Sequence, residues 1–264
     1  MEIKRNIRTP KVFHFIWVGG KMPKDTEEYI ELTREMYPDW EVKIWTEKEL
    51  DVNKHKYSRL AYQQKKWAFV SDFFRVRIML DHGGVYLDTD MIPVRRIDSL
   101  IKNKVVIGFE YSKMISTGFV AAEKDHPIFR KLVSIYESFD NLPDNKIKFI
   151  VNNELWTLFL VKTYGLKLNN KPQLLLGDIQ VQNQNHFSDF KKSLDTYFLH
   201  DHQLSWTSPV KRKLMIVGLK ITRRFNLLMK PILVLQKEQY FLKNKRILKN
   251  VDNNIKKQLF LDNK

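Results

Sequence analysis

The chain has 264 residues, of which 43% are hydrophobic and 29% are charged, and its formal net charge at pH 7 is +16. This composition is typical of a soluble globular protein, and the length suffices for one domain with a good core, with or without an appendage. No apolar run approaches the roughly 18 to 20 residues that span a membrane, and the lack of cysteine excludes disulfides, thiolate metal sites and cysteine nucleophiles. Because the first residues, MEIKRN, also lack the apolar core of a secretion signal, these features predict a cytoplasmic protein.

The first residues after this segment alternate between strand and helix patterns. A continuous apolar run predicts a buried strand at 12–18, and alternation predicts a second strand at 41–45. Between them the pattern predicts a helix at 25–37, with Asp25 and Glu28 arranged like a capping box. A unit of strand, helix and strand implies a mainly parallel sheet, with ligands at the carboxyl ends of its strands.

A second helix is predicted at 61–82, where apolar residues recur at spacings of three and four and the glycine pair at 83–84 provides a stop. Its apolar stripe consists of Trp67, Val70, Phe74 and Ile78. Asp72 and Arg75 lie three residues apart and are therefore neighbours on one turn. They either form a surface ion pair, which contributes little to stability, or reach toward one ligand.

An acidic pair follows the glycines in the run GGVYLDTD at 83–90. In an extended chain Tyr86, Asp88 and Asp90 point to one face. Mg²⁺ and Mn²⁺ prefer oxygen ligands and often retain substrate phosphates, so this pair predicts a metal site that holds a diphosphate. Such a triplet also occurs as a turn or a helix cap. The helix that ends directly before it favours the metal site, because it brings Asp72 and Arg75 close.

The α/β pattern continues to residue 138. A strand is predicted at 105–109, a turn around 116–118, a strand at 119–122 and a helix at 127–138.

The composition becomes basic at Pro209, and we therefore predict two domains, 1–208 and 209–264. Residues 209–250 contain twelve lysines and arginines but one acid, Glu238, and these charges are interleaved with apolar residues. This pattern favours binding to an anionic membrane surface. Helices packed on the core and a nucleic-acid patch are the alternatives, but the chain shows no recognised nucleic-acid motif, so no nucleic acid is expected.

Three motifs resemble glycosyltransferase family 32, the DxD-containing sugar transferases related to the glucosylating clostridial toxins. SDFFR at 71–75 together with 83–90 is similar to the sugar-binding region of that family. PKVFHFIWVGG at 10–20 resembles its first strand, and HDHQLSW at 200–206 resembles its C-terminal signature. The resemblance implies an α/β, GT-A-like fold, which is a Rossmann-like mixed sheet with flanking helices. The basic segment would follow it as a C-terminal helical extension.

The resemblance also implies roles for individual residues. Asp88, Asp90 and His202 would bind Mn²⁺ or Mg²⁺, and His200 is the alternative ligand because it lies two residues away. Asp72 and Arg75 resemble the pair that hydrogen-bonds the transferred sugar. The implied catalytic residues are Asp72, Arg75, Asp88 and Trp206.

The implied donor is a UDP-sugar. Trp17, with Val18 beside it, resembles the residue that stacks on uracil, and Tyr86 resembles an aromatic wall near the nucleotide. Trp206 resembles the group that donates to the leaving diphosphate oxygen. The full implied donor site is Trp17, Val18, Asp72, Arg75, Tyr86, Asp88, Ser205 and Trp206.

These motifs predict a metal-dependent, retaining glycosyltransferase that moves a hexose to a glycan or lipid-linked acceptor. Its place would be bacterial surface or capsular polysaccharide synthesis, peripherally at the inner face of the cell membrane. Two alternatives remain open: a metal-dependent phosphodiesterase or nuclease, and a non-catalytic membrane-surface protein with the same fold.

Overall fold

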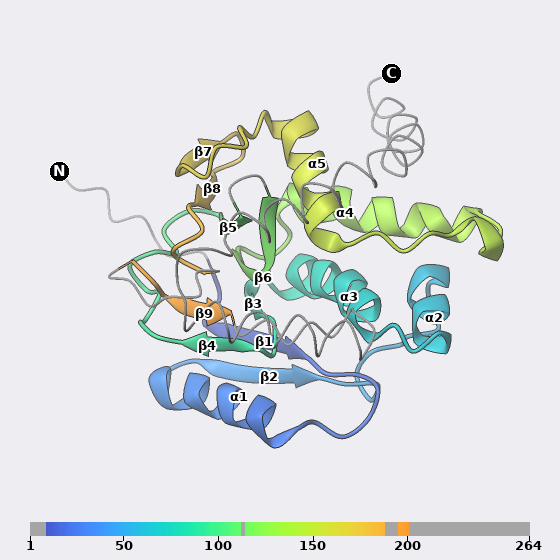
Figure 1. Ribbon diagram of the computed structural model, residues 1–264, viewed down its shortest axis with the longest axis horizontal. Helices are drawn as coiled ribbons and strands as arrows, with labels where there is room; N and C mark the ends of the chain where they lie inside the picture. The colour runs from blue at the N-terminus through green and yellow to red at the C-terminus, as the bar shows by residue number, and fades with distance from the viewer. Residues whose placement is uncertain (1–8, 112–113, 188–194, 201–264) are drawn as a thin grey trace, which may run out of the picture. The chain divides into compact units, whose positions relative to one another are not determined.

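A mixed sheet of seven strands forms the centre of the computed structural model, which describes residues 9–111, 114–187 and 195–200 (Figure 1). In spatial order the strands are β2 (Glu41–Trp45), β1 (Val12–Ile16), β3 (Gly84–Leu87), β6 (Met114–Ala122), β5 (Val105–Tyr111), β8 (Ile179–Gln182) and β7 (Gln173–Leu175). A separate pair consists of β4 (Met91–Pro93) and β9 (Phe198–His200). The helices are α1 (Lys24–Met36), α2 (Lys56–Gln63), α3 (Trp67–His82), α4 (Pro127–Glu137) and α5 (Asn152–Tyr164), with short 3-10 turns at Ser138–Asn141 and Asp144–Lys146.

The sheet confirms the predicted α/β class, but it is mixed rather than mainly parallel. The neighbours β2, β1 and β3 run parallel, as do β5 and β8. The contacts of β6 with β3 and β5, and of β7 with β8, are antiparallel. Only two residues separate β5 from β6 in the sequence, and a connection this short joins antiparallel strands.

Three local predictions were wrong. The helix expected at 61–82 is two helices, because Lys65 takes a left-handed φ of 54° between α2 and α3. Asp25 was expected at the start of the first helix, but it lies inside α1, because the helix begins at Lys24 and its N-cap residue is Pro23. Ser116, Thr117 and Gly118, expected in a turn, lie within β6.

Helices and the small sheet cover the two faces of the central sheet. Helix α1 contacts β2 and β4, whereas α3 contacts β1 and β3 and α5 contacts β6. Successive residues of β1 and β3 point to opposite faces, so Phe13, Val85 and Leu87 enter the core cluster on the α1 face. Tyr86 therefore faces α3, where the Arg75 guanidinium lies over its ring.

The turn between α3 and β3 needs its two glycines. Gly83 and Gly84 have φ values of 66° and 91°, which other residues rarely adopt. A Cβ atom on Gly84 would also lie 2.7 Å from the Val12 carbonyl oxygen. The predicted glycine stop thus places β3 directly against β1.

His14 of β1 is locked as a neutral ring beneath this turn. The Trp45 indole Nε1 donates to His14 Nδ1 at 3.1 Å, and His14 Nε2 lies 2.9 Å from the Gly83 carbonyl oxygen. Because indole nitrogen only donates, Nδ1 accepts and Nε2 carries the proton. Burial, aided by the charges of His82 and Lys43, lowers the pKa of His14 to about 4 although the bond to Gly83 opposes it.

Lowering the pH from 7 to 4 is therefore expected to destabilise the fold through His14. Between the unfolded pKa of 6.5 and the folded value of about 4, the unfolded chain binds more protons, so stability falls as pH falls. The contribution lost is roughly 3 kcal/mol. Urea unfolding of wild type and of His14→Gln across this range measures it. The variant should be less stable at pH 7 and should lack this part of the pH dependence, and equal pH dependence in both proteins would contradict the assignment.

Within the described residues, no helix combines the length and apolar character needed to cross a bilayer. The predicted domain boundary at 208/209 and the basic segment 209–250 lie outside the described residues.

Candidate functional site

The acidic pair lies in a turn between β3 and β4. Strand β3 ends at Leu87, and the Met91 amide donates to the Asp88 carbonyl oxygen at 3.1 Å across the turn. The Asp88 amide donates to the Gly118 carbonyl oxygen of β6 at 2.8 Å. Asp88 and Asp90 thus come together because the chain turns, whereas the sequence predicted an extended strand through both.

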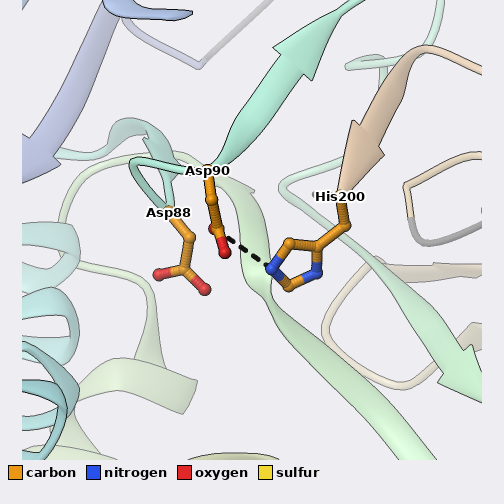
Figure 2. A group of neighbouring side chains, drawn as sticks. All are labelled: Asp88, Asp90 and His200. Carbon is orange, nitrogen blue, oxygen red and sulfur yellow. Dashed lines mark ion pairs between the residues drawn. The ribbon is translucent and has the colours of Figure 1, made fainter. Parts of the chain in front are cut away.

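His200 of β9 completes this group (Figure 2). Because β9 pairs antiparallel with β4, His200 lies opposite Met91, next to the acidic turn. Its Nε2 lies 3.1 Å from Asp90 Oδ1. One ligand atom from each of Asp88, Asp90 and His200 lies within 4.8 Å of the others, and all three side chains are partly buried.

The charges of this group fit a divalent cation. Burial lowers the pKa of the His200 ring, but Asp90, Glu110 and Asp88 outweigh it and raise that pKa to about 9. The carboxylates therefore stabilise a positive charge at this point. Two carboxylates with one imidazole form a donor set that suits Mn²⁺ better than Mg²⁺, because imidazole favours the softer ions.

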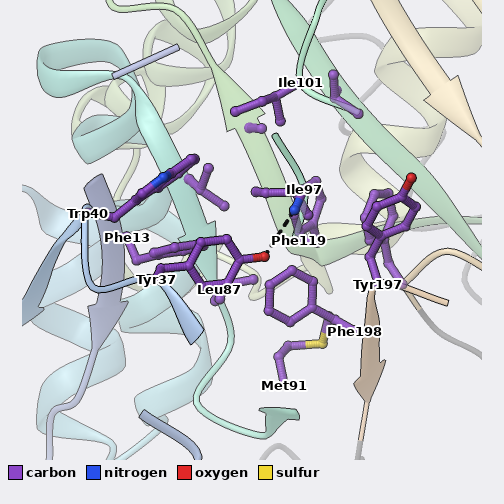
Figure 3. Packing of buried hydrophobic residues seen from close by; sticks show 14 of the residues in the cluster. Phe13, Tyr37, Trp40, Leu87, Met91, Ile97, Ile101, Phe119, Tyr197 and Phe198 are labelled. Carbon is purple, nitrogen blue, oxygen red and sulfur yellow. Dashed lines mark hydrogen bonds between the residues drawn. The ribbon is translucent and has the colours of Figure 1, made fainter. Parts of the chain in front are cut away.

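The strands around the three ligands are anchored in one hydrophobic core (Figure 3). Leu87 ends β3, Met91 begins β4 and Phe198 begins β9, and all three side chains are fully buried in the same cluster. Packing of such residues fixes the backbone on either side of the acidic turn. The ligands thus extend from a rigid base.

Arg75 holds Asp88 from the helix side. Its Nη2 donates to Asp88 Oδ1 at 3.0 Å and lies 3.2 Å from Asp72 Oδ1, and its Nη1 donates to the Thr117 carbonyl oxygen at 2.5 Å. The Tyr86 hydroxyl donates to the same Asp88 oxygen at 2.8 Å. Both of these bonds to Asp88 involve its Oδ1 atom, whereas Asp88 Oδ2 is the atom that a Cβ on Gly118 would meet first.

Asp72 is buried and its charge is poorly solvated. Burial raises the pKa of the Asp72 carboxyl to about 7, and although Arg75 lowers it, Asp88 raises it further. A carboxyl with this pKa exists near neutrality as both a hydrogen-bond donor and an acceptor. Perturbed groups of this kind cluster at functional sites.

A close approach of β6 shapes the floor of the site. A Cβ atom on Gly118 would lie 2.9 Å from Asp88 Oδ2 and 3.4 Å from His200 Cε1. Any larger residue would push the carboxylate out of the position fixed by Arg75 and Tyr86. The Ser-Thr-Gly segment that the sequence predicted as a turn is therefore part of the site.

The other predicted donor residues are placed as follows. Trp17 lies just beyond β1, partly exposed, with its indole Nε1 donating to the Gly20 carbonyl oxygen at 2.8 Å, and Val18 is buried. Since β1 and β3 are parallel neighbours, Trp17 and the acidic pair both lie just beyond the carboxyl ends of these strands, at the same edge of the sheet. Tyr86 is buried beneath Asp88. His202, Ser205 and Trp206 lie outside the described residues, so their roles stay predictions.

Sequence reasoning missed Glu110 and Asn153. Glu110 of β5 is buried, and its negative charge helps to raise the pKa of His200. Asn153 of α5 donates through Nδ2 to Glu110 Oε2. The available signal was a single acid inside the apolar run VVIGFEY at 105–111, because an acid is rarely buried unless it is paired.

Comparison with known proteins places the central part of the site in a recognised region. Residues 23–107 match the family model described as the glycosyltransferase sugar-binding region containing a DXD motif. Inositol phosphoceramide mannosyltransferase 2 of Schizosaccharomyces pombe is 24% identical over 206 residues, which cover 75% of this chain and 58% of the relative. Subversion of eukaryotic traffic protein A of Legionella pneumophila is 28% identical over 109 residues, which cover 31% of this chain and 17% of that protein.

Among solved structures, the chain is similar to the PaToxG glycosyltransferase, with a TM-score of 0.44 and 17% sequence identity. The match covers 58% of this chain and 69% of the other. The chain spans less than two thirds of the length of the curated relatives named above. The family match and the relatives support the predicted glycosyltransferase class. Residues 23–107, which carry Asp72, Arg75 and the acidic pair, are similar to the DXD-containing sugar-binding region of glycosyltransferases.

Proposed function

We propose that this chain is a metal-dependent glycosyltransferase that moves a hexose from a UDP-sugar to a glycan or lipid-linked acceptor with retention of configuration. The observation that carries the proposal is the convergence of Asp88, Asp90 and His200 on one point. Asp88 and Asp90 lie within the matched sugar-binding region, and His200 follows it in the sequence. The donor atoms fit a hard or borderline divalent ion. Such an ion, when bound, supplies electrostatic stabilisation of the charge on a departing diphosphate.

The residues of the chain then have separate tasks. Asp88, Asp90 and His200 would hold the ion, with Mn²⁺ favoured by the imidazole. Arg75 and Tyr86 fix one Asp88 oxygen, so that the carboxylate is oriented before the ligand arrives. Asp72 would accept from or donate to a hydroxyl of the sugar, as its pKa of about 7 permits.

The fission yeast relative is named as a mannosyltransferase that acts on inositol phosphoceramide. A hexose donor and a lipid-linked acceptor for this chain agree with that name.

We propose that the reaction belongs to bacterial surface or capsular polysaccharide synthesis at the inner face of the cell membrane. The net charge of the segment 209–250 supports this location, because basic residues interleaved with apolar ones bind anionic lipid. Sedimentation of the full chain with anionic but not with neutral vesicles is the expected result, and equal sedimentation with both would contradict it.

The test of the activity is release of nucleoside diphosphate by the purified full chain in the presence of Mn²⁺. The panel contains UDP-glucose, UDP-galactose, UDP-N-acetylglucosamine and GDP-mannose. Slow hydrolysis of one UDP-sugar, abolished by a chelator and restored by Mn²⁺, is the expected result. Turnover of GDP-mannose alone would overturn the UDP part of the proposal. Hydrolysis of a polynucleotide, with no turnover of any donor sugar, would support the phosphodiesterase alternative.

A further inference from the structure

The β5–β6 pairing is irregular next to the acidic turn. Val106 pairs with Ala121, but the next pair is Gly108 with Ser116, so residues 117–120 of β6 lie opposite Ile107 alone. Such a shift in register removes backbone groups from the regular ladder, and buried groups must then find other partners.

Thr117 finds those partners in two side chains. Its amide donates to Asn153 Oδ1 at 3.2 Å, and its hydroxyl donates to the same oxygen at 2.5 Å. Its carbonyl oxygen accepts from Arg75 Nη1 at 2.5 Å. One peptide segment of β6 thus connects Asn153 of α5 with Arg75 of α3.

A second irregularity inserts Glu110 into β5. Phe109 pairs with Ile115 and Tyr111 pairs with Met114, so Glu110 has no opposite residue in β6. An extra residue of this kind re-aims its side chain, and such bulges are common beside active sites. Glu110 is 6% exposed, and its Oε2 accepts from Asn153 Nδ2.

These bonds orient the Asn153 amide completely. With Nδ2 directed at Glu110, Oδ1 must face Thr117. The start of α5 is held in place as well, because the Thr157 hydroxyl donates to the Asn153 carbonyl oxygen at 2.6 Å and accepts from the Ile115 amide at 2.9 Å. A continuous path therefore runs from Glu110 through Asn153, Thr117 and Arg75 to Asp88.

We propose that Glu110 and Asn153 are positioning residues: Glu110 orients the Asn153 amide, which holds Thr117 so that its carbonyl oxygen fixes Arg75 against Asp88. The inference rests on the proposed function and deepens it. A purely electrostatic role for Glu110 is the competing interpretation, since its charge also acts on His200. The two roles differ in what an uncharged hydrogen-bonding side chain at this position does.

The experiment compares four variants and one control variant of the full chain with wild type, each checked for folding by circular dichroism. Glu110→Ala removes the acceptor and is expected to lower kcat for donor hydrolysis by about 10- to 100-fold. Glu110→Gln keeps an oxygen that accepts from Asn153, and it is expected to stay within about threefold of wild type. Asn153→Asp places two carboxylates together and should lose activity as Glu110→Ala does.

The double variant Glu110→Gln with Asn153→Asp tests the positioning role most directly, because it restores the hydrogen bond with donor and acceptor exchanged. Here the new glutamine amide donates to the new aspartate, whose oxygens still accept from Thr117, so activity should return to within about threefold of Glu110→Gln. The matched control is Glu123→Ala, which removes a carboxylate just beyond the other end of β6, where it pairs with Lys104 at 3.5 Å. The control should behave like wild type.

The outcomes distinguish failure of the positioning role from failure of the proposed function. If wild type hydrolyses a donor, then an active Glu110→Ala, a Glu110→Gln as impaired as Glu110→Ala, or a double variant without recovery each overturns the positioning role. If wild type hydrolyses no donor, the proposed function has failed. Mn²⁺ affinity of the same variants then decides the positioning role, because misplaced Asp88 should weaken binding by about tenfold in Glu110→Ala but not in Glu110→Gln.

Discussion

Replacing Asp90 with asparagine is expected to lower donor hydrolysis at least about 100-fold while the protein stays folded. The side chain keeps its size and an oxygen that accepts from His200 Nε2, but the charge that a divalent cation requires is lost. Thermal unfolding and turnover of the donor found with wild type are the two measurements. The decrease should be in turnover, and the melting temperature should change little.

Asp98→Asn is the matched control for this variant. Asp98 belongs to a surface cluster with Arg96, and its side chain is 38% exposed, so loss of its charge should leave turnover unchanged. If Asp90→Asn retained more than about half of the turnover of Asp98→Asn, the acidic pair would not be the metal site.

Replacing Arg75 with lysine is expected to lower turnover about 10- to 100-fold and to destabilise the fold by about 1–3 kcal/mol. The guanidinium reaches Thr117, Asp88 and Asp72 at once, and its Cζ lies over the Tyr86 ring at 4.4 Å from the ring centre. Lysine keeps the charge but cannot reproduce this planar fork. Asp88 would then lose one of the two donors that hold its Oδ1 atom, and Tyr86 alone would orient it.

The same helix offers a control two residues further on. Arg77 is 38% exposed and pairs with Asp81 and Glu137 at the surface, so Arg77→Lys should change stability by less than about 0.5 kcal/mol and leave turnover intact. Both variants are compared by urea unfolding and by donor hydrolysis. Equal behaviour of Arg75→Lys and Arg77→Lys would show that Arg75 is an ordinary ion-pair residue.

Local pattern was enough to predict the central strands and the acidic pair. The apolar run at 12–18 and the alternation at 41–45 correspond to β1 and β2, because both patterns reflect burial of neighbouring residues along one strand. The glycine pair at 83–84 marked the end of α3 and the start of β3 for a local reason, since both residues take positive φ. The proximity of Asp72, Arg75 and Asp88 followed from these elements.

Features that depend on pairing between distant segments were not predictable. Which histidine joins the acidic pair depends on the register of β4 with β9, where Met91 opposes His200. The sequence resemblance favoured His202, which lies outside the described residues, and kept His200 as the alternative. Likewise Glu110 reaches Asn153 only because β5 carries an extra residue against β6, and no local pattern marks such a shift.

Electron paramagnetic resonance of Mn²⁺ added to the full chain, with and without UDP, tests the metal site most directly. Wild type should bind Mn²⁺, and UDP should tighten that binding, because a diphosphate and the ion would share the site formed by Asp88, Asp90 and His200. Asp90→Asn and His200→Gln should weaken Mn²⁺ binding at least about tenfold and reduce the effect of UDP. Mn²⁺ binding that is unchanged in both variants and indifferent to UDP would contradict a diphosphate-holding metal site at this turn.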